Sequence, residues 1–266
     1  MQVYHPAGMF HQLPPEDVFQ VADDMGNDMG MGYLVYQYQP HLYPDCPINL
    51  YFSMDCQPAA RYMLLGALMA RARQLRDSDP NARARVYTNI DPQDVRMKAF
   101  YEHSGLDCSQ GEDVLLLSMP IGDGRIPMSC TVAQTPVNTP EEQAALLYRL
   151  QQNDITYIDA AYLNQLRCMP HFSVLGLYRN TELVGEVLMA GEGERCELAG
   201  IYITPMCRRQ GMGRALLHRC MAIMAAEGVT QITARIMTRS QPQVRLMRSF
   251  NPQVLGQTML YPGLFL

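Results

Sequence analysis

The chain has 266 residues, 48% of them hydrophobic and 18% charged, with 21 basic and 26 acidic residues and a net charge of −5. This globular composition excludes disordered, collagen-like and coiled-coil proteins. No apolar run approaches the roughly 18–20 residues of a membrane helix. The N-terminus also lacks the basic and apolar regions of a signal peptide, so we expect a cytoplasmic protein with no membrane partner.

The first half of the chain begins with an acidic segment. Residues 1–50 contain six acidic residues and no lysine or arginine. The stretch Gly26–Gly32 is rich in glycine and predicts a mobile loop. The apolar run Val114–Leu117 predicts a strand that closes the first unit. The two glycines and two prolines of Met119–Pro127 then predict a linker over residues 120–127.

The second half predicts a regular α/β order. Thr139-Pro140-Glu141-Glu142 has the residues of a helix start: a capping threonine, a proline in the first turn, and acids at the positive end of the helix dipole. Polar turns and a proline bound the strands that follow. In chain order we expect strand 131–135, helices 140–152 and 158–166, strands 173–178, 183–189 and 196–204, helix 213–226, strand 231–237 and helix 242–250. This order predicts a mostly antiparallel sheet with one parallel crossover.

The sequence contains an internal repeat. Ala-Arg-Val-Tyr-Thr at Ala84–Thr88 matches Ala-Arg-Ile-Met-Thr at Ala234–Thr238, and Pro-Gln and Val-Arg follow in both copies. Upstream, Leu50–Phe52 parallels Ile201–Ile203. Chance similarity of short apolar strings is the alternative, but it does not account for the matched order of elements. The repeat predicts two copies of one α/β unit, over residues 1–119 and 128–266.

The most informative stretch is a basic, glycine-containing loop between a strand and a helix. Residues 201–250 hold eight arginines and one glutamate. The loop reads Arg208-Arg-Gln-Gly211-Met-Gly213-Arg214. Glycine lets the backbone approach a ligand, and amide groups converge at the positive end of the helix. With its arginines, the loop predicts a pyrophosphate cradle.

Other anion-binding classes do not fit this loop. A P-loop needs Lys where Arg214 stands, and a Rossmann fingerprint needs a third glycine where Leu216 stands. Nucleic acid is not an expected partner, because the chain is acidic as a whole and its basic residues do not alternate with aromatic ones. The eight cysteines and six histidines are scattered, so we expect reduced thiols and no metal site.

The loop resembles that of the GNAT-type N-acetyltransferase superfamily. The resemblance rests on strand–Arg208-x-x-Gly211-x-Gly213–helix, preceded by Pro205 and followed by Ala215-Leu-Leu217. It covers residues 128–266, and the repeat implies a weaker copy over 1–119. It implies a tandem of GNAT-like α/β domains, each a mixed sheet with a splayed parallel strand pair. The implied co-substrate is acetyl-CoA, and an amine of a small molecule or peptide would attack its acetyl group directly.

The resemblance also implies the contacts of acetyl-CoA. Its pyrophosphate would bind the amides of residues 209–214, its pantetheine arm would pair with the backbone of Ile201 and Ile203, and Ser240 could add a hydrogen bond. The implied cofactor-binding residues are Ile201, Tyr202, Ile203, Arg208, Arg209, Gln210, Gly211, Met212, Gly213, Arg214 and Ser240.

Glu197 is the candidate catalytic base. An amine with a pKa near ~10.4 is mostly protonated at pH 7, so a base is needed. Glu197 lies 208 − 197 = 11 residues before the first loop arginine, a spacing similar to that of the base glutamate in some family members. Glu186 and Glu194 are reserves. The alternative is that Glu197 only forms an ion pair with one of the arginines.

The chain departs from the family at the general acid. Met247 or Phe250, depending on the alignment, stands where a tyrosine is expected, and Tyr202 or Tyr261 could substitute. The first copy has Tyr101 at that place, but its loop, Asp55 to Arg61, lacks glycine. Arg61-x-x-Leu64-x-Gly66 resembles a decayed version of the motif. We therefore expect the first domain to be structural and not to bind acetyl-CoA.

Two functions remain open: an acetyl-CoA-dependent N-acetyltransferase, and a non-catalytic acyl-CoA-binding or sensing protein. The carboxylate at Glu197 favours the enzyme, and the missing tyrosine favours the sensor. The acidic N-terminal segment hints at a cationic acceptor. No motif specifies the acceptor or the oligomeric state.

Overall fold

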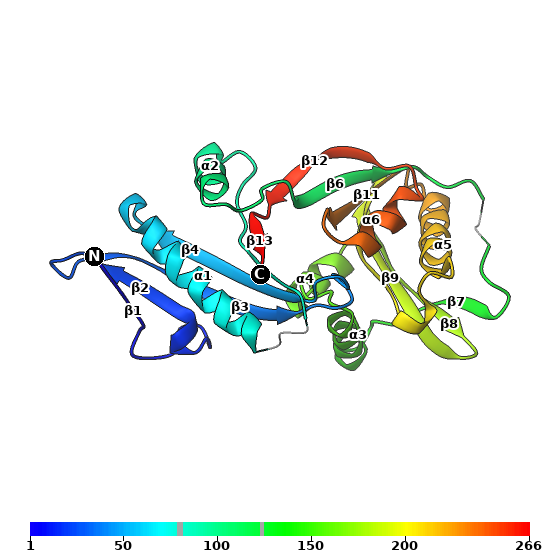
Figure 1. Ribbon diagram of the computed structural model, residues 1–266. Helices are drawn as coiled ribbons and strands as arrows, with labels where there is room; N and C mark the ends of the chain where they lie inside the picture. Colours follow the sequence, from blue (N-terminus) through cyan, green and yellow to red (C-terminus); the bar gives the residue numbers. More distant parts are fainter. Residues whose placement is uncertain (79–81, 123–124) are drawn as a thin grey trace. The chain divides into compact units, whose positions relative to one another are not determined.

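A computed structural model describes residues 1–78, 82–122 and 125–266. The chain divides into two compact units (Figure 1). Unit 1 comprises Met1–Gly111 and Met259–Leu266, and unit 2 comprises Glu112–Thr258. Each unit has its own mixed sheet, and the expected α/β fold class is confirmed.

Among the described residues, unit 1 builds a six-stranded sheet in the order β1-β2-β3-β4-β5-β13. Its pairs are antiparallel except for β4 and β5, which run parallel. The strands are β1 (Gln2–Tyr4), β2 (Val18–Ala22), β3 (Asp28–Tyr38), β4 (Ile48–Cys56), β5 (Ala84–Tyr87) and β13 (Gly263–Phe265).

One face of this sheet carries the hydrophobic core of unit 1. The 17-residue helix α1 (Arg61–Asp77) covers it with Leu64, Leu68 and Ala72, which recur at helical spacing and are fully buried. The helix α2 (Val95–His103) adds Tyr101 to the same core. Two short 3₁₀ helices precede β2 and α1, namely η1 (Pro15–Asp17) and η2 (Pro58–Ala60).

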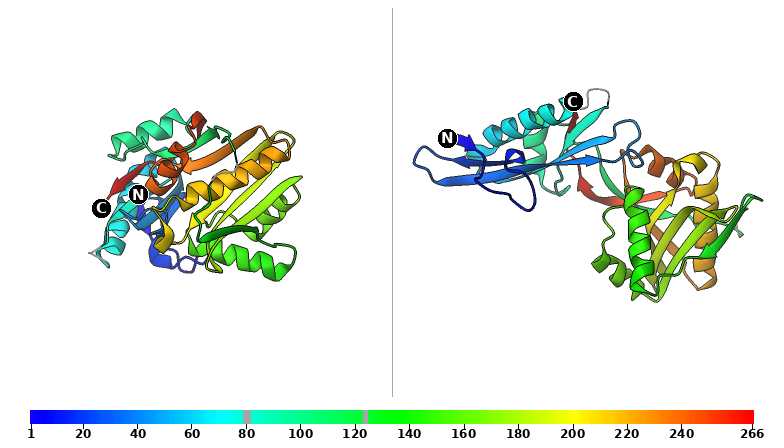
Figure 2. Two further views of the ribbon diagram at one scale, coloured as in Figure 1. Left: turned by 90° about the vertical axis from the view of Figure 1, so that its right-hand side faces the viewer. Right: turned by 90° about the horizontal axis from the view of Figure 1, so that it is seen from below.

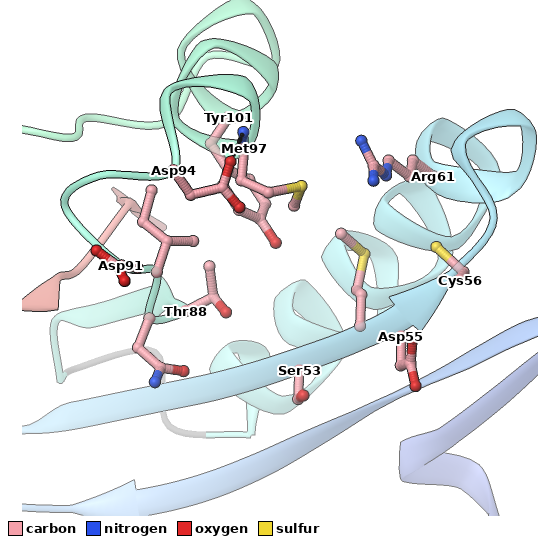
Figure 3. A pocket seen from close by; sticks show the side chains of 12 residues that line it. Ser53, Asp55, Cys56, Arg61, Thr88, Asp91, Asp94, Met97 and Tyr101 are labelled. Carbon is pink, nitrogen blue, oxygen red and sulfur yellow. Dashed lines mark hydrogen bonds between the residues drawn. The ribbon is translucent and has the colours of Figure 1, made fainter.

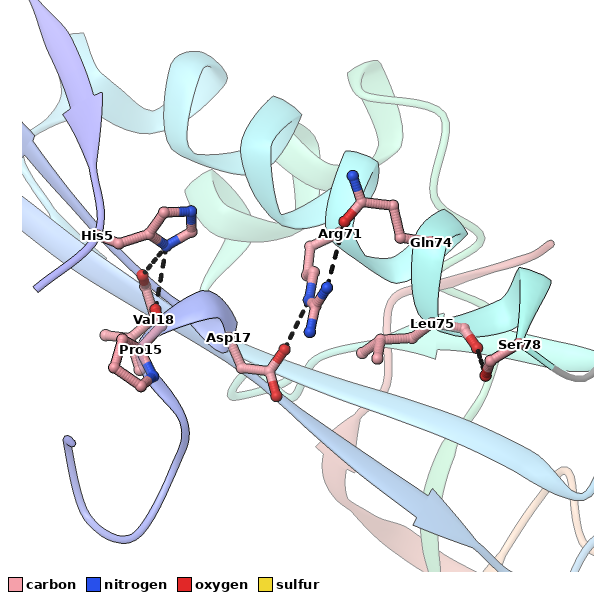
Figure 4. Close-up of polar contacts among 8 residues, drawn as sticks. All are labelled: His5, Pro15, Asp17, Val18, Arg71, Gln74, Leu75 and Ser78. Atoms are coloured by element: carbon pink, nitrogen blue, oxygen red, sulfur yellow. Dashed lines mark hydrogen bonds and ion pairs between the residues drawn. The ribbon is translucent and has the colours of Figure 1, made fainter. Parts of the chain in front are cut away.

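Polar contacts attach the N-terminal segment to unit 1 (Figure 4). Arg71 of α1 donates to Asp17 at 2.7 Å, and both side chains are mostly buried. The His5 ring is 2.8 Å from the Val18 carbonyl oxygen and 3.0 Å from that of Pro15. These contacts hold η1 and β2 beside α1.

The expected loop at Gly26–Gly32 is partly wrong, because β3 already begins at Asp28. Gly30 and Gly32 lie so close to β4 that a Cβ atom would stand 2.3 Å from Cys56 Cα and 2.9 Å from the Ser53 carbonyl oxygen. The glycines therefore permit a close approach of two strands and do not mark mobility.

Unit 2 builds a seven-stranded sheet, counted over the described residues, in the order β12-β6-β11-β10-β9-β8-β7. Here β10 and β11 form the parallel pair. The strands are β6 (Gly111–Leu117), β7 (Cys130–Gln134), β8 (His171–Arg179), β9 (Glu182–Glu192), β10 (Arg195–Ile203), β11 (Gln231–Met237) and β12 (Gln253–Leu260).

Helices cover both faces of this sheet (Figure 2). One face packs against α5 (Met212–Ala226), and the other packs against α3 (Pro140–Gln152) and α4 (Ala160–Arg167). The expected start of α3 is present as a capping box between Thr139 and Glu142. The remaining helices are η3 (Pro205–Cys207) and α6 (Gln241–Arg248).

The boundary between the units differs from the expected linker at 120–127. The expected strand Val114–Leu117 forms within β6, but β6 pairs with β11 of unit 2. In turn β13, at the end of the second copy, pairs with β5 of unit 1. A strand pattern predicts a strand without naming its partner, and two similar sheets offer equivalent edges. Residues 123–124 lie outside the described part.

Two observations concern membranes and metals in the described residues. None of the helices there combines the length and the apolarity needed to cross a membrane. No group of three or more His, Cys, Asp or Glu side chains is arranged there to hold a metal ion.

Candidate functional site

The site of interest is the place where β10 and β11 separate. Their parallel pairing runs from Arg195 with Gln231 to Leu198 with Ala234 and then stops. Beyond it, β10 continues along β9 as far as Ile203, and β11 continues along β6. A register shift between Leu198 and Gly200 marks the fork.

The separation leaves one edge of β10 unpaired by a strand. The Thr204 amide donates to the Val184 carbonyl oxygen at 2.8 Å. Antiparallel ladders alternate, so the backbone groups of Tyr202 face β9, while those of Ile201 and Ile203 face the open edge. The Arg208 Nε donates to the Ile203 carbonyl oxygen at 2.8 Å, as that orientation requires.

A four-residue loop follows η3 and precedes α5. Arg209 has a φ of 61°, and Gly211, the N-cap of α5, has a φ of 76°. These two left-handed residues turn the chain so that Arg209, Gln210, Gly211 and Arg214 are exposed, whereas Met212 is buried in the core. A Cβ atom at Gly211 would meet nothing within 4 Å, so the space over the loop is open.

The loop presents backbone donors without acceptors. In the described part of the chain, the N–H groups of residues 209–214 have no hydrogen-bond acceptor. The first protein acceptor in this helix belongs to Ala215, whose N–H binds the Gly211 carbonyl oxygen at 3.0 Å. A row of free amides at the positive end of a 15-residue helix favours an anion.

The loop arginines differ in their surroundings. Arg209 and Arg214 are exposed and can contact an anion. Arg208 instead folds back onto β10, and desolvation lowers the pKa of its guanidinium, although nearby Asp154 opposes this. Arg208 therefore supports the shape of the turn, and its side chain does not face outward with the other two.

Glu197 lies on β10 next to the fork and forms an ion pair. Its carboxylate accepts a hydrogen bond from Arg235 Nε at 2.8 Å, and this bond raises the pKa of Arg235. The ion pair that sequence analysis left as the alternative for Glu197 is thus present. Both side chains keep substantial exposure, 31% for Glu197 and 48% for Arg235, so water reaches the carboxylate.

Two tyrosines near Glu197 were missed by sequence analysis. The Tyr157 hydroxyl donates to the Ala199 carbonyl oxygen at 2.7 Å, at the register shift itself. Desolvation of the hydroxyl groups raises the pKa of Tyr157 and of Tyr162, and the charge of Glu197 contributes in both cases. Tyr157 lies in the connection between α3 and α4, where no periodic pattern marks a residue as functional.

The reserve carboxylates are occupied elsewhere. Glu186 on β9 is 1% exposed and accepts two hydrogen bonds from Arg149, at 2.8 and 2.9 Å. The Tyr202 hydroxyl also donates to it, at 2.6 Å, and burial beside this carboxylate raises the pKa of Tyr202. Glu194 accepts from Thr230 at the opposite end of β10 from the loop. Tyr202 thus has neither its backbone nor its hydroxyl at the open edge.

The residues at the family's acid position are part of the core. Met247 is 2% exposed and Phe250 is 4% exposed, and both pack under α5 and β11. Ser240, the N-cap of α6, is fully buried, so the expected contact of its hydroxyl with a bound ligand is not open to solvent. Tyr261, a possible substitute acid, lies in unit 1.

At the described junction of η2 and α1, unit 1 has no equivalent loop. The 3₁₀ helix η2 leads directly into α1, because both Ala60 and Arg61 have right-handed helical angles. The stretch that resembles a decayed motif is therefore helical, and Leu64 is a core residue. Tyr101 is also a core residue, and burial raises its pKa to about 12.

Comparisons with known proteins agree with this geometry. The acetyltransferase (GNAT) family model matches residues 141–251. The chain is similar to the crystal structure of a GCN5-related N-acetyltransferase from Sphaerobacter thermophilus, with 15% identity, coverage of 96% of this chain and 82% of that one, and a TM-score of 0.50.

Two further structures are similar. A GCN5-related N-acetyltransferase from Anabaena variabilis has 9% identity over 94% of this chain and 63% of its own length, with a TM-score of 0.52. A tandem GNAT protein from the clavulanic acid biosynthesis pathway has 14% identity over 93% of this chain and 82% of its own, with a TM-score of 0.47. No protein with curated annotation matches the chain significantly.

At these identities the structural likeness establishes the fold alone. The family match covers α3 from its second residue, the forked strands and the loop before α5. Residues 141–251 therefore form a domain of the acetyltransferase (GNAT) family, within a chain whose two mixed sheets fit two GNAT-like units.

Proposed function

We propose that unit 2 binds acetyl-CoA along the loop 208–214 and the open edge of β10, and that the protein transfers the acetyl group to an amine of a small molecule or peptide. The family match supports this activity at the general level. The observation that carries the proposal is the row of unbonded amides at residues 209–214, immediately after a strand whose edge is open.

The residues present fit the pyrophosphate and the arm of acetyl-CoA. The amides of residues 209–214 and the exposed side chains of Arg209 and Arg214 would hold the pyrophosphate. The backbone groups of Ile201 and Ile203 face the open edge and would pair with the pantetheine amides. When bound, acetyl-CoA supplies a thioester that an amine can attack.

Glu197 is the residue we propose to accept the proton of the amine. Its carboxylate lies beside the fork, is partly exposed to water, and is held by Arg235. The ion pair fixes the position of the carboxylate, and its exposure lets a water molecule carry a proton to it. The thiol product, with a pKa near ~8.5, can leave as an anion without a dedicated acid.

A second candidate function is acyl-CoA binding without catalysis. The burial of Met247 and Phe250 favours it, because neither side chain can donate a proton at the acid position. The ion pair of Glu197 with Arg235 favours it as well, because the carboxylate already accepts a hydrogen bond from the guanidinium group.

One experiment separates the two candidates. Acetyl transfer to a panel of amines is measured for the wild type, Glu197→Gln and Glu194→Gln. Glu194 lies in the turn just before the same strand and serves as the matched control. If Glu197 is the base, Glu197→Gln lowers kcat by about 10²–10⁴-fold, while the dissociation constant of acetyl-CoA stays unchanged. Wild type that binds acetyl-CoA and acetylates no amine would support the second candidate. An unchanged kcat in Glu197→Gln would contradict the assigned base.

A further inference from the structure

Unit 1 contains a cavity of about 300 Å³ where β4 and β5 separate (Figure 3). Their parallel pairing ends at Tyr51 with Tyr87, and β4 continues along β3 to Cys56. The walls are the end of β4, the start of α1, the segment after β5 and one face of α2. A volume of this size suits a small molecule.

The inner wall of the cavity is partly polar. Figure 3 shows the hydroxyl groups of Thr88 and Tyr101 turned toward its centre. The apolar side chains of Met54 and Met97 also line the cavity. Thr88 is 3% exposed and Tyr101 is 2% exposed. Buried hydroxyl groups beside an apolar side chain can fix the orientation of a ligand that has both polar and apolar parts.

Two opposite charges reach the cavity from different elements. Arg61 is the first residue of α1, and within the described residues its guanidinium has no ion pair or hydrogen bond, only a contact with the Phe100 ring at 5.9 Å. Asp94 is the N-cap of α2 and accepts the Met97 amide through Oδ1 at 3.0 Å. Its second oxygen is available to a ligand, and Figure 3 shows the carboxylate directed inward.

The cavity does not suit a phosphate ligand. In the described segment Pro58–Asp77, α1 begins directly after η2, without the loop of unbonded amides found in unit 2. The four charged residues that line the cavity are Arg61, Asp55, Asp91 and Asp94, which sum to 1 − 3 = −2. A net negative lining disfavours anions and tolerates a ligand with an ammonium group.

We propose that this cavity binds a small zwitterion of the amino-acid type. Its carboxylate pairs with Arg61, its ammonium group pairs with Asp94, and Thr88 and Tyr101 bond its remaining polar atoms. This site is separate from the loop 208–214, and it does not depend on the acetyl transfer proposed above.

The test is calorimetric titration of the full chain with free L-leucine, L-lysine and L-glutamate. Isopentylamine and 4-methylpentanoate, which keep one charge each, are titrated alongside. The variants are Arg61→Gln and Asp94→Asn, with exposed Arg96→Gln and Asp45→Asn as matched controls. Asparagine is as good an N-cap as aspartate, so Asp94→Asn keeps the start of α2.

We expect at least one of the three amino acids to bind, with lysine preferred over glutamate because of the negative lining. Each of Arg61→Gln and Asp94→Asn then raises its dissociation constant about tenfold or more, as expected for the loss of a charge-assisted bond. The control variants leave it unchanged, and the single-charge probes bind at least about tenfold more weakly.

Three results would overturn the proposal. The first is no binding of any of the three amino acids at millimolar concentration. The second is binding that Arg61→Gln and Asp94→Asn leave unaltered while their circular dichroism shows a folded protein. The third is binding abolished by Glu197→Gln, which would place the amino acid in unit 2 as an acceptor. Titration of acetyl-CoA into the same proteins reports separately on the loop 208–214.

Discussion

The two units join their central strand to the following helix in different ways. In unit 1, η2 continues into α1 without a break. In unit 2, Arg208–Gly211 separate η3 from α5, with left-handed angles at Arg209 and Gly211. Four extra residues thus convert a covered helix start into an exposed row of amides. The two copies of the scaffold therefore differ: one carries a loop with unbonded amides, where we propose a phosphate cradle, and the other carries a small cavity.

The matched arginines of the repeat show a second difference. Arg235 on β11 is exposed and pairs with Glu197 at the fork. Arg85, its counterpart on β5, is 3% exposed and donates to the Tyr261 carbonyl oxygen at 2.7 Å. The neighbouring strand determines whether this arginine is exposed, because β13 and the residues before it cover Arg85 in unit 1. The same sequence motif therefore has a structural role in one unit and a place at the candidate site in the other.

The buried ion pair of unit 2 should give the largest effect on stability. Arg149→Met leaves the Glu186 side chain 1% exposed and without its bidentate partner, and the loss of one partner of such a pair costs about 3–5 kcal/mol. Urea unfolding measures the change, with exposed Gln151→Met on the same helix as control. A loss of stability no greater than that of the control would contradict a stabilising role for the ion pair of Arg149 with Glu186.

Deletion of Met259–Leu266 tests which unit the C-terminal strand stabilises. Leu260 is 6% exposed, and Tyr261 accepts the hydrogen bond of Arg85, so the deletion should cost about 3 kcal/mol or more. Hydrogen exchange should show lost protection in β4 and β5 of unit 1 and retained protection in α5. Loss of protection confined to β7 and β8 of unit 2 would instead favour the boundary expected from the sequence, at residues 120–127.

Tyr101 of unit 1 corresponds to Phe250 of unit 2, which cannot ionise. We expect Tyr101 to make the free energy of unfolding depend on pH, an effect smaller than the two above. Burial raises the pKa of Tyr101 from 10.0 to about 12. The contribution of the neutral Tyr101 phenol to the free energy of unfolding is therefore complete below pH 10. It is lost as the pH rises toward 12, at about 1.4 kcal/mol per pH unit. Tyr101→Phe should flatten the alkaline decline by up to that slope, measured by urea unfolding between pH 9 and 11. Parallel curves for both proteins would contradict the buried phenol.

Local sequence patterns predicted the helices and strands, but they did not predict which strands pair with one another. The capping residues of α3 and the glycine loop before α5 have local causes, and both form as expected. The exchange of β6 and β13 between the sheets depends on which edge each strand meets, and hydrophobic runs do not record that choice. Similarly, the glycines at Gly30 and Gly32 look like a loop until the neighbouring strand is known.

The candidate site likewise combines local features, which the sequence predicted, with long-range contacts, which it did not. The row of amides at residues 209–214 follows from the motif, because the amides belong to the loop itself. The ion pair of Glu197 with Arg235 and the bond from Tyr157 to Ala199 join residues about 40 positions apart, and only the fold brings them together. The burial of Ser240, the N-cap of α6, is likewise a property of the fold, which a single hydroxyl in the sequence does not reveal.

The most direct measurement is titration of acetyl-CoA and desulfo-CoA into wild type, Gly211→Trp and Gly193→Trp. Both glycines have left-handed angles and open space around the missing Cβ, so the two variants carry similar backbone strain of about 1–2 kcal/mol. Only Gly211 lies at the amides of the loop. Binding in wild type and Gly193→Trp that disappears in Gly211→Trp is the predicted result. Binding that survives in Gly211→Trp, or none in wild type at millimolar acetyl-CoA, would contradict the phosphate cradle.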